Sequence, residues 1–318
     1  HLIFIVKIKN NMRVCILGNN LSSLTLAKAL VNLKIRVDIL FSKKSNLLNQ
    51  SRTIGISKSN LEFFNKNIIN IEKIIWKIKK IEIYSDNMKR QRLINFENKN
   101  DHLFSIVKNY KLQLILDKKL KKNKYFKIIN PKKNINYKED YDIVFNTDYN
   151  NIVTKKYFNK KIEKLYNSYA YTTIIRHEKI ANDIATQIFT KNGPIAFLPI
   201  SNTSTSIVYS IHNSKDTKKL NITDSISYYN PKYKIKKINS IESFELKSFI
   251  LRSYYYKNIL AFGDLLHRLH PLAGQGFNMT VRDVKLLLEI IKEKKNLGLP
   301  LDSSINQKFE KKLNICRC

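Results

Sequence analysis

The chain has 318 residues, which is enough for one large domain or for two domains of ordinary size. Its 58 Lys and Arg residues against 25 Asp and Glu residues give a formal net charge of +33. The lysines are dispersed along the chain, and aromatic residues do not alternate with them as they do in single-strand binders. We therefore expect a generally basic surface and no nucleic-acid partner, while weak attraction to an anionic membrane stays open.

Three cysteines, Cys15, Cys316 and Cys318, do not make a disulfide framework, and no histidine stands beside them at metal-ligand spacing. We expect a reducing compartment and no metal. No apolar run approaches the roughly 18–20 residues that span a bilayer. The chain is therefore expected to be cytoplasmic, with peripheral association at the inner face of the membrane as an open alternative. Residues 1–11 precede Met12 and are interpreted as upstream readthrough.

The first elements in chain order predict a βαβ unit. Residues 13–18 form an apolar segment that ends in glycine, residues 21–33 carry apolar side chains at helical spacing, and residues 35–41 form a second apolar segment. A strand, a tight turn, a helix and a parallel strand place the helix N-terminus where it can bind a pyrophosphate.

The later segments continue the alternation of strands and helices. They are, in order, strand 75–86, helix 109–122, strand 141–148, a hairpin of 193–200 with 205–212, strand 258–264 and helix 277–295. The strands form two sets, one parallel and interleaved with helices, the other antiparallel and inserted between pieces of the first. The predicted fold class is α/β with an inserted antiparallel sheet.

The turn after the first strand differs from the dinucleotide-binding pattern G-x-G-x-x-G. Gly18 keeps the first glycine, Asn20 replaces the second, and Ser23 replaces the third. Asparagine tolerates a left-handed backbone, and serine is small enough for close packing of helix and strand. Phe41 stands where an acidic residue would bind ribose hydroxyls. This turn alone is weak evidence for a dinucleotide site, and an ordinary βα turn stays open.

Residues 263–278 (GDLLHRLHPLAGQGFN) hold three of the 7 glycines in the chain. Asp264 follows a predicted strand, at the edge where open α/β sheets bind ligands, and its carboxylate can accept hydrogen bonds from ribitol or ribose hydroxyls. Gly274 and Gly276 allow backbone N–H groups to approach a flat ring system without a Cβ in between. Asn278 opens the last long helix, so its amide and the helix N-terminus are expected to point at one place.

This stretch and its continuation, GDLLHRLHPLAGQGFNMTVRDVKLL, resemble the signature G-D-x-x-H-x-x-H-P-x-x-G-Q-G-x-N-x-G-x-x-D of the flavin-dependent aromatic hydroxylases. The branch that hydroxylates polyprenyl phenols in ubiquinone biosynthesis is the most similar. The resemblance implies a Rossmann-like FAD-binding domain with an inserted antiparallel-sheet substrate domain. It extends to the βαβ unit, to the segment around Arg52, to the strand that ends at Asp148 and to residues 185–199.

The resemblance also implies boundaries and an activity. The FAD-binding domain would comprise 12–74, 99–165 and 251–318, and the substrate domain 75–98 and 166–250. NAD(P)H would reduce FAD, and one oxygen atom of O2 would be added to the ring of a polyprenylated phenol. The cofactor supplies this chemistry, so no catalytic residue is assigned.

The residues expected to bind FAD are those that match the family's motifs. They are Gly18, Asn20, Ser23, Arg52, Asp264, Pro271, Gly274, Gln275, Gly276 and Asn278. His267 and His270 are expected to have structural roles rather than roles in acid–base catalysis.

Departures from the motifs leave alternatives open. Besides Asn20, Ser23 and Phe41, Tyr149 replaces the glycine after Asp148, and Met279-Thr280 replaces a residue-glycine pair. A degenerate, non-catalytic subunit of a ubiquinone-synthesis complex, another FAD oxidoreductase of the same fold and a nucleic-acid binder remain as alternatives. Family members continue further than residue 318, so we expect a shortened C-terminus.

Overall fold

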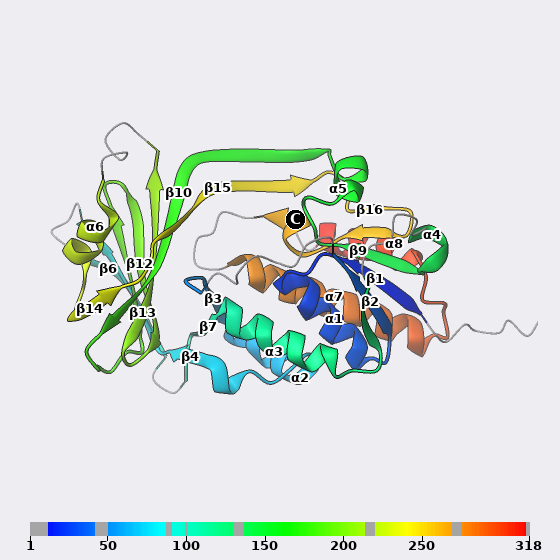
Figure 1. Cartoon of the computed structure of the whole chain (residues 1–318), viewed down its shortest axis with the longest axis horizontal. Coiled ribbons are helices and arrows are strands. Elements are labelled where there is room, and N and C mark those ends of the chain that lie inside the picture. Colours follow the sequence, from blue (N-terminus) through cyan, green and yellow to red (C-terminus); the bar gives the residue numbers. More distant parts are fainter. Residues whose placement is uncertain are drawn as a thin grey trace, which may run out of the picture.

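The computed structural model describes residues 12–41, 50–86, 91–98, 101–129, 137–213, 220–268 and 275–315. Figure 1 shows a parallel sheet with helices beside it in one part of the molecule and a large, mostly antiparallel sheet in the other. This confirms the predicted fold class.

The sheet of the first part has six strands. In spatial order they are β16 (Tyr255–Tyr256), β17 (Ile259–Ala261), β9 (Ile143–Asn146), β1 (Arg13–Leu17), β2 (Arg36–Leu40) and β8 (Phe126–Ile129). All neighbouring pairs from β17 to β8 are parallel, and Ile16 of β1 lies opposite both Ile39 and Phe145. Strand β9 is buried along its whole length, as expected for a parallel strand covered on both faces.

The helices lie mainly in this part (Figure 1). They are α1 (Leu21–Asn32), α2 (Lys58–Asn67), α3 (Asn109–Lys121), α4 (Tyr137–Asp140), α5 (Ile152–Tyr157), α6 (Ile222–Tyr229), α7 (Gln275–Asn296) and α8 (Ser304–Ile315), with 3-10 turns η1 (Glu72–Ile74) and η4 (Gly263–Leu265). Helix α1 packs against α3 and α7, and α6 lies with the antiparallel sheet. Helix α7 begins two residues before its predicted start, inside the glycine-containing segment.

A three-stranded sheet adjoins the first part. It contains β3 (Thr53–Ser57), β7 (Phe104–Lys108) and β4 (Ile75–Ile78). The prediction of one strand over 75–86 is wrong, because β4 pairs with β7 whereas the next strand, β5 (Lys80–Ser85), pairs with β11 and β6. The chain changes sheet at Lys79, whose N–H donates to the carbonyl of Asp183 at 2.9 Å.

The large sheet has nine strands. They are, in order, β18 (His267–Arg268), β15 (Glu242–Leu251), β10 (Lys161–His177), β13 (Ser204–His212), β12 (Gly193–Ser201), β11 (Ile184–Thr190), β5 and β6 (Gln91–Glu97), with β14 (Ile235–Ile238) paired to β10. The predicted hairpin is confirmed, since β12 and β13 pair antiparallel. The 17-residue β10 and its partner β15 extend out of the sheet as a ribbon along the first part (Figure 1).

Each part has its own hydrophobic core. The core of the first part joins β1, α1, β9, β17 and α7, and the core of the large sheet lies under α6 around Phe197 and Tyr209. The domain boundaries stay a prediction. Strand pairing places β4 with the three-stranded sheet and the start of β10, at Lys161, in the large sheet.

Candidate cofactor site

The candidate site lies at the carboxyl ends of the parallel strands. Strands β2 and β8, which follow β1 in the chain, lie on one side of β1 in the sheet. The later strands β9 and β17 lie on its other side. Open α/β sheets bind their ligands at such a reversal of strand order. Gly18 follows β1, Thr147 and Asp148 follow β9, and Gly263 follows β17, so this edge gathers three of the segments that the sequence singled out.

Gly18 is required by its backbone and by its neighbours. Its φ of +113° is one that side-chain-bearing residues rarely adopt, and an added Cβ would lie 2.6 Å from Oγ1 of Thr147. Its N–H donates to the carbonyl of Leu40 at 2.9 Å. The turn therefore lies tightly between β1, β2 and the end of β9.

Asn20 and Ser23, the two replacements in the glycine pattern, form a polar cluster with Thr147. Asn20 caps α1: its Oδ1 accepts from the backbone N–H of Ser23 at 2.9 Å, and Ser23 Oγ accepts from the N–H of Asn20 at 3.3 Å. Asn20 Nδ2 donates to the carbonyl of Thr147 at 3.0 Å, and the hydroxyls of Ser23 and Thr147 lie 2.6 Å apart. These side chains thus fix α1 to the end of β9 and satisfy one amide of its first turn.

Gly263 brings the turn after β17 against α1. Its φ is +62°, and an added Cβ would lie 2.5 Å from Cβ of Ser22. The hydroxyl of Ser22 is also 3.4 Å from that of Thr280 on α7. The βαβ turn, the turn at Gly263 and the start of α7 are therefore in direct contact, and Asp264 stands exposed beside them.

Asn278 fastens the first turn of α7 to β3 and α2. Its Oδ1 accepts from the N–H of Ser57 at 3.0 Å and from Nδ2 of Asn60 at 2.8 Å, and its Nδ2 donates to the carbonyl of Gly55 at 2.8 Å. The amide is thus used in positioning the helix. Gly276, two residues earlier, has open space around the place of a Cβ.

Arg52 lies at the other end of β3, against the large sheet. Its guanidinium lies over the ring of Phe244, 5.4 Å from the centroid. Nearby, the hydroxyls of Ser51 and Thr172 are 3.2 Å apart and those of Thr53 and Ser206 are 2.9 Å apart. These contacts join β3 to the face of the nine-stranded sheet.

Of the predicted cofactor residues, the structure gathers Gly18, Asn20, Ser23, Asp264, Gly276 and Asn278 around the reversal of strand order and the start of α7. Gln275 is the first residue of α7, with only its backbone described. Pro271, Gly274 and His270 lie outside the described residues. Their roles in binding stay predictions.

The sequence reading missed the residues that connect these segments. Thr147 and Asn60 each bond to a predicted site residue, and Ser22 lies against Gly263 and Thr280. Thr147 could have been found, because it directly follows a buried strand beside Asp148. Ser22 and Asn60 gave no signal, because their partners lie more than 200 positions away in the chain.

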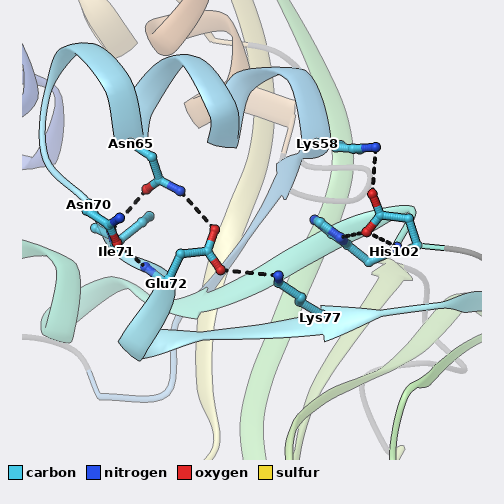
Figure 2. Close-up of polar contacts among 8 residues, drawn as sticks. Lys58, Asn65, Asn70, Ile71, Glu72, Lys77 and His102 are labelled. Carbon is cyan, nitrogen blue, oxygen red and sulfur yellow. Dashed lines mark hydrogen bonds and ion pairs between the residues drawn. The ribbon is translucent and has the colours of Figure 1, made fainter.

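An ion-pair cluster holds α2, the helix that carries Asn60 (Figure 2). Lys58 Nζ lies 2.6 Å from one carboxylate oxygen of Asp101. The other oxygen accepts a hydrogen bond from the backbone N–H of His102 and contacts the ring of the same residue. The Lys58 ammonium, followed by His102, lowers the pKa of Asp101. At the other end of α2, Glu72 bonds to Asn65 and pairs with Lys77.

Cys15 lies in β1 as a small hydrophobic side chain. Burial, and next the nearby charge of Asp38, raise the pKa of its thiol, so it stays protonated. Asp38 itself lies 3.4 Å from Arg13 and accepts from the hydroxyl of Tyr141 at 3.0 Å. Within the described ranges, no group of three His, Cys, Asp or Glu residues could hold a metal ion.

One segment of the chain matches a known family model. Residues 183–296 match the family model of the FAD binding domain. The match covers strands β11 to β15 of the large sheet and the segment from Gly263 to α7, and the βαβ turn that contacts this segment lies outside it.

Sequence comparisons with known proteins agree with the family match. The ubiquinone biosynthesis monooxygenase COQ6, mitochondrial, of Drosophila melanogaster is 25% identical over 213 residues, with 54% of this chain and 45% of that protein covered. The 3-demethoxyubiquinol 3-hydroxylase of Escherichia coli strain K12 is 27% identical over 134 residues, covering 39% and 33%. The chain thus spans less than half the length of these relatives. The resemblance to the flavin-dependent aromatic hydroxylases is confirmed.

The fold also resembles that of a solved structure. The crystal structure of pqsL, a probable FAD-dependent monooxygenase from Pseudomonas aeruginosa, superimposes with a TM-score of 0.76 at 13% identity, covering 95% of this chain and 92% of that one. In the part of the chain that the structure describes, no helix has the length and apolar character needed to cross a membrane.

The residues of the candidate site fit FAD. Gly276 leaves the backbone of α7 accessible and Asp264 is exposed, while Gly18 lets the turn lie against Thr147. Helix α1 has no acidic residue in its first turn, so the positive end of the helix is not neutralised. The Asn20 cap uses one amide of that turn, so a pyrophosphate would depend on the remaining N–H groups.

Proposed function

We propose that the protein is an FAD-dependent monooxygenase that hydroxylates the aromatic ring of a polyprenylated phenol in ubiquinone biosynthesis. NAD(P)H is the proposed reductant and O2 the proposed oxidant. One contact carries this proposal: Gly263 packs on Ser22, so the segment of the FAD binding domain meets the βαβ turn. The two curated relatives support the substrate class.

In this proposal each segment of the site has a separate task. The Gly18 turn and the N-terminus of α1 hold the pyrophosphate, Asp264 accepts hydrogen bonds from ribitol hydroxyls, and the backbone around Gly276 lies along the ring system. Asn278 positions this backbone through β3. Bound FAD would accept two electrons from NAD(P)H and activate O2, and the large sheet would exclude water from the ring.

The overall reaction is Ar–H + O2 + NAD(P)H + H⁺ → Ar–OH + H2O + NAD(P)⁺. The test is consumption of NAD(P)H by the FAD-loaded chain with and without a prenylated phenol, run under ¹⁸O2. We expect stimulated consumption and a product with one ¹⁸O atom. Consumption that the phenol does not stimulate, with all reducing equivalents recovered as hydrogen peroxide, would contradict the proposal.

A second candidate is a non-catalytic subunit of a ubiquinone-synthesis complex. The Asn20 cap favours it, because a side chain satisfies an amide that a pyrophosphate would otherwise bind. Equilibrium binding of FAD separates the two, since such a subunit would bind none. With a net charge of +33 and an apolar substrate, peripheral membrane binding also belongs to the proposal, and co-sedimentation with anionic vesicles tests it.

A further inference from the structure

A cavity of about 570 Å³ lies apart from the candidate cofactor site, between the start of α3 and the ends of β10 and β14. None of the predicted cofactor residues that the structure describes lines it. Its volume falls within the usual range for small-molecule sites. Nothing in the proposed function uses it.

The charge of this cavity has one sign. Lys108, Arg176, Lys236 and Lys237 line it, and none of the described residues in its lining carries a carboxylate. Among the described residues, no ion pair involves any of these four cations. A smaller neighbouring hollow of about 310 Å³ contains Glu242, so the positive charge is concentrated in the larger one.

The cations are held together against their mutual repulsion. Arg176 of β10 and Lys237 of β14 are direct cross-strand partners, an arrangement that destabilises a sheet when both residues carry the same charge. Burial, and then the charges of Lys111 and Arg176, lower the pKa of Lys108. A multivalent anion between these side chains would relieve both effects.

Neutral donors and a helix end complete the lining. Thr203 and Ser204 contribute hydroxyls, and Gln50 and Asn239 contribute amides. Lys108 and Tyr110 stand at the N-terminus of the 13-residue α3, which has no side-chain cap and no acidic residue in its first turn. The positive end of this helix adds to the field of the cations.

We propose that this cavity binds the pyrophosphate group of a small anion. Pyrophosphate is the chemistry that the site recognises, because four cations and two hydroxyl donors that line one cavity match its dispersed negative charge. A nicotinamide dinucleotide carries this group, and so do free inorganic anions. The inference does not require the proposed hydroxylase activity.

The test is a calorimetric titration of the full chain with inorganic pyrophosphate and with NADPH, at low salt and with and without saturating FAD. The test variant is Lys108→Gln with Arg176→Gln. The matched control is Lys122→Gln with Lys127→Gln, which removes two exposed charges outside the cavity. We expect the Kd for pyrophosphate to rise by about 100-fold in the test variant, roughly tenfold for each charge, and by less than about twofold in the control.

The NADPH arm separates the sources of the anion. Parallel losses for NADPH and pyrophosphate assign the site to the dinucleotide, whereas loss for pyrophosphate alone assigns it to another small phosphate compound, and either result supports a phosphate site. Absence of pyrophosphate binding by the wild type, or equal losses in test and control variants, overturns it.

Thermal unfolding keeps the test valid if a variant folds poorly. Without ligand, Arg176→Gln should raise Tm, because it removes a like-charge pair. Pyrophosphate should raise the Tm of the wild type more than that of Arg176→Gln. Equal shifts in both proteins count against the site.

Discussion

Replacement of Gly263 by alanine tests the contact on which the site depends. The backbone there has φ of +62°, and the new Cβ would lie 2.5 Å from Cβ of Ser22, an atom fixed on α1. Left-handed backbone costs about 1–2 kcal/mol for a residue with a side chain. Overpacking adds about 1–3 kcal/mol. We therefore expect Gly263→Ala to lower the free energy of unfolding by about 2–5 kcal/mol.

Gly298 provides a matched control, because its φ is +65° and nothing lies within 4 Å of the place of its Cβ. Gly298→Ala should therefore cost only the backbone part, about 1–2 kcal/mol. The difference between the two variants isolates the contact with Ser22. In a double-mutant cycle, Ser22→Gly should recover part of the loss caused by Gly263→Ala.

Urea unfolding of the four variants, together with FAD titration of each, measures these effects. FAD affinity should fall in Gly263→Ala, because η4 must move away from α1, and stay near the wild-type value in Gly298→Ala. Equal unfolding free energies for the two alanine variants, or additivity in the cycle with Ser22→Gly, would refute the contact between η4 and α1.

Three further results are expected. Asn278→Ala should lower the free energy of unfolding by about 2–4 kcal/mol, because it leaves the N–H of Ser57 and the carbonyl of Gly55 without their partner. A urea midpoint equal to that of the wild type would contradict this expectation. Asn20→Gly should strengthen FAD binding, since it frees the N–H of Ser23. It should also cost about 1 kcal/mol of stability, because it removes the hydrogen bond to Thr147. Weaker FAD binding would count against the assigned turn. Because the pKa of Asp101 is lowered in the folded state, its contribution is present above about pH 4 and is lost as the pH falls further. Wild type and Asp101→Asn should thus differ in stability at pH 7 and converge in acid, and a constant difference would be inconsistent with the ion pair.

The parallel part of the fold was predicted well from local sequence patterns, because each of its strands and helices shows its own apolar pattern. Apolar runs and helical spacing indicated β1, α1, β2 and α3 to within one or two residues. The change of sheet at Lys79 was missed, although the alternation of apolar and polar residues breaks there, where Lys79 and Lys80 stand together between Ile78 and Ile81. The backbone of Lys79 bonds to the long-range partner Asp183.

The turns of the candidate site could be predicted from the sequence, but the hydrogen bonds of its side chains could not. The dinucleotide-binding pattern indicated Gly18 and the glycine-containing stretch 263–278 included Gly263, and both have positive φ values. Asn20 and Ser23 were expected as tolerated replacements in a glycine turn. Their hydrogen bonds to the end of β9 depend on Thr147, more than 100 positions away, and no local pattern carries that information.

Equilibrium binding of FAD to the wild type and to Asp264→Ala tests the central claim most directly. Asp264 is exposed, so its replacement should leave the fold intact, and Asp224→Ala, an exposed carboxylate on α6, is the control. We predict one FAD per wild-type chain, at least about tenfold weaker binding for Asp264→Ala, and wild-type binding for the control. No flavin binding by the wild type, or equal affinities for all three proteins, would contradict the assignment of this sheet edge as a flavin site.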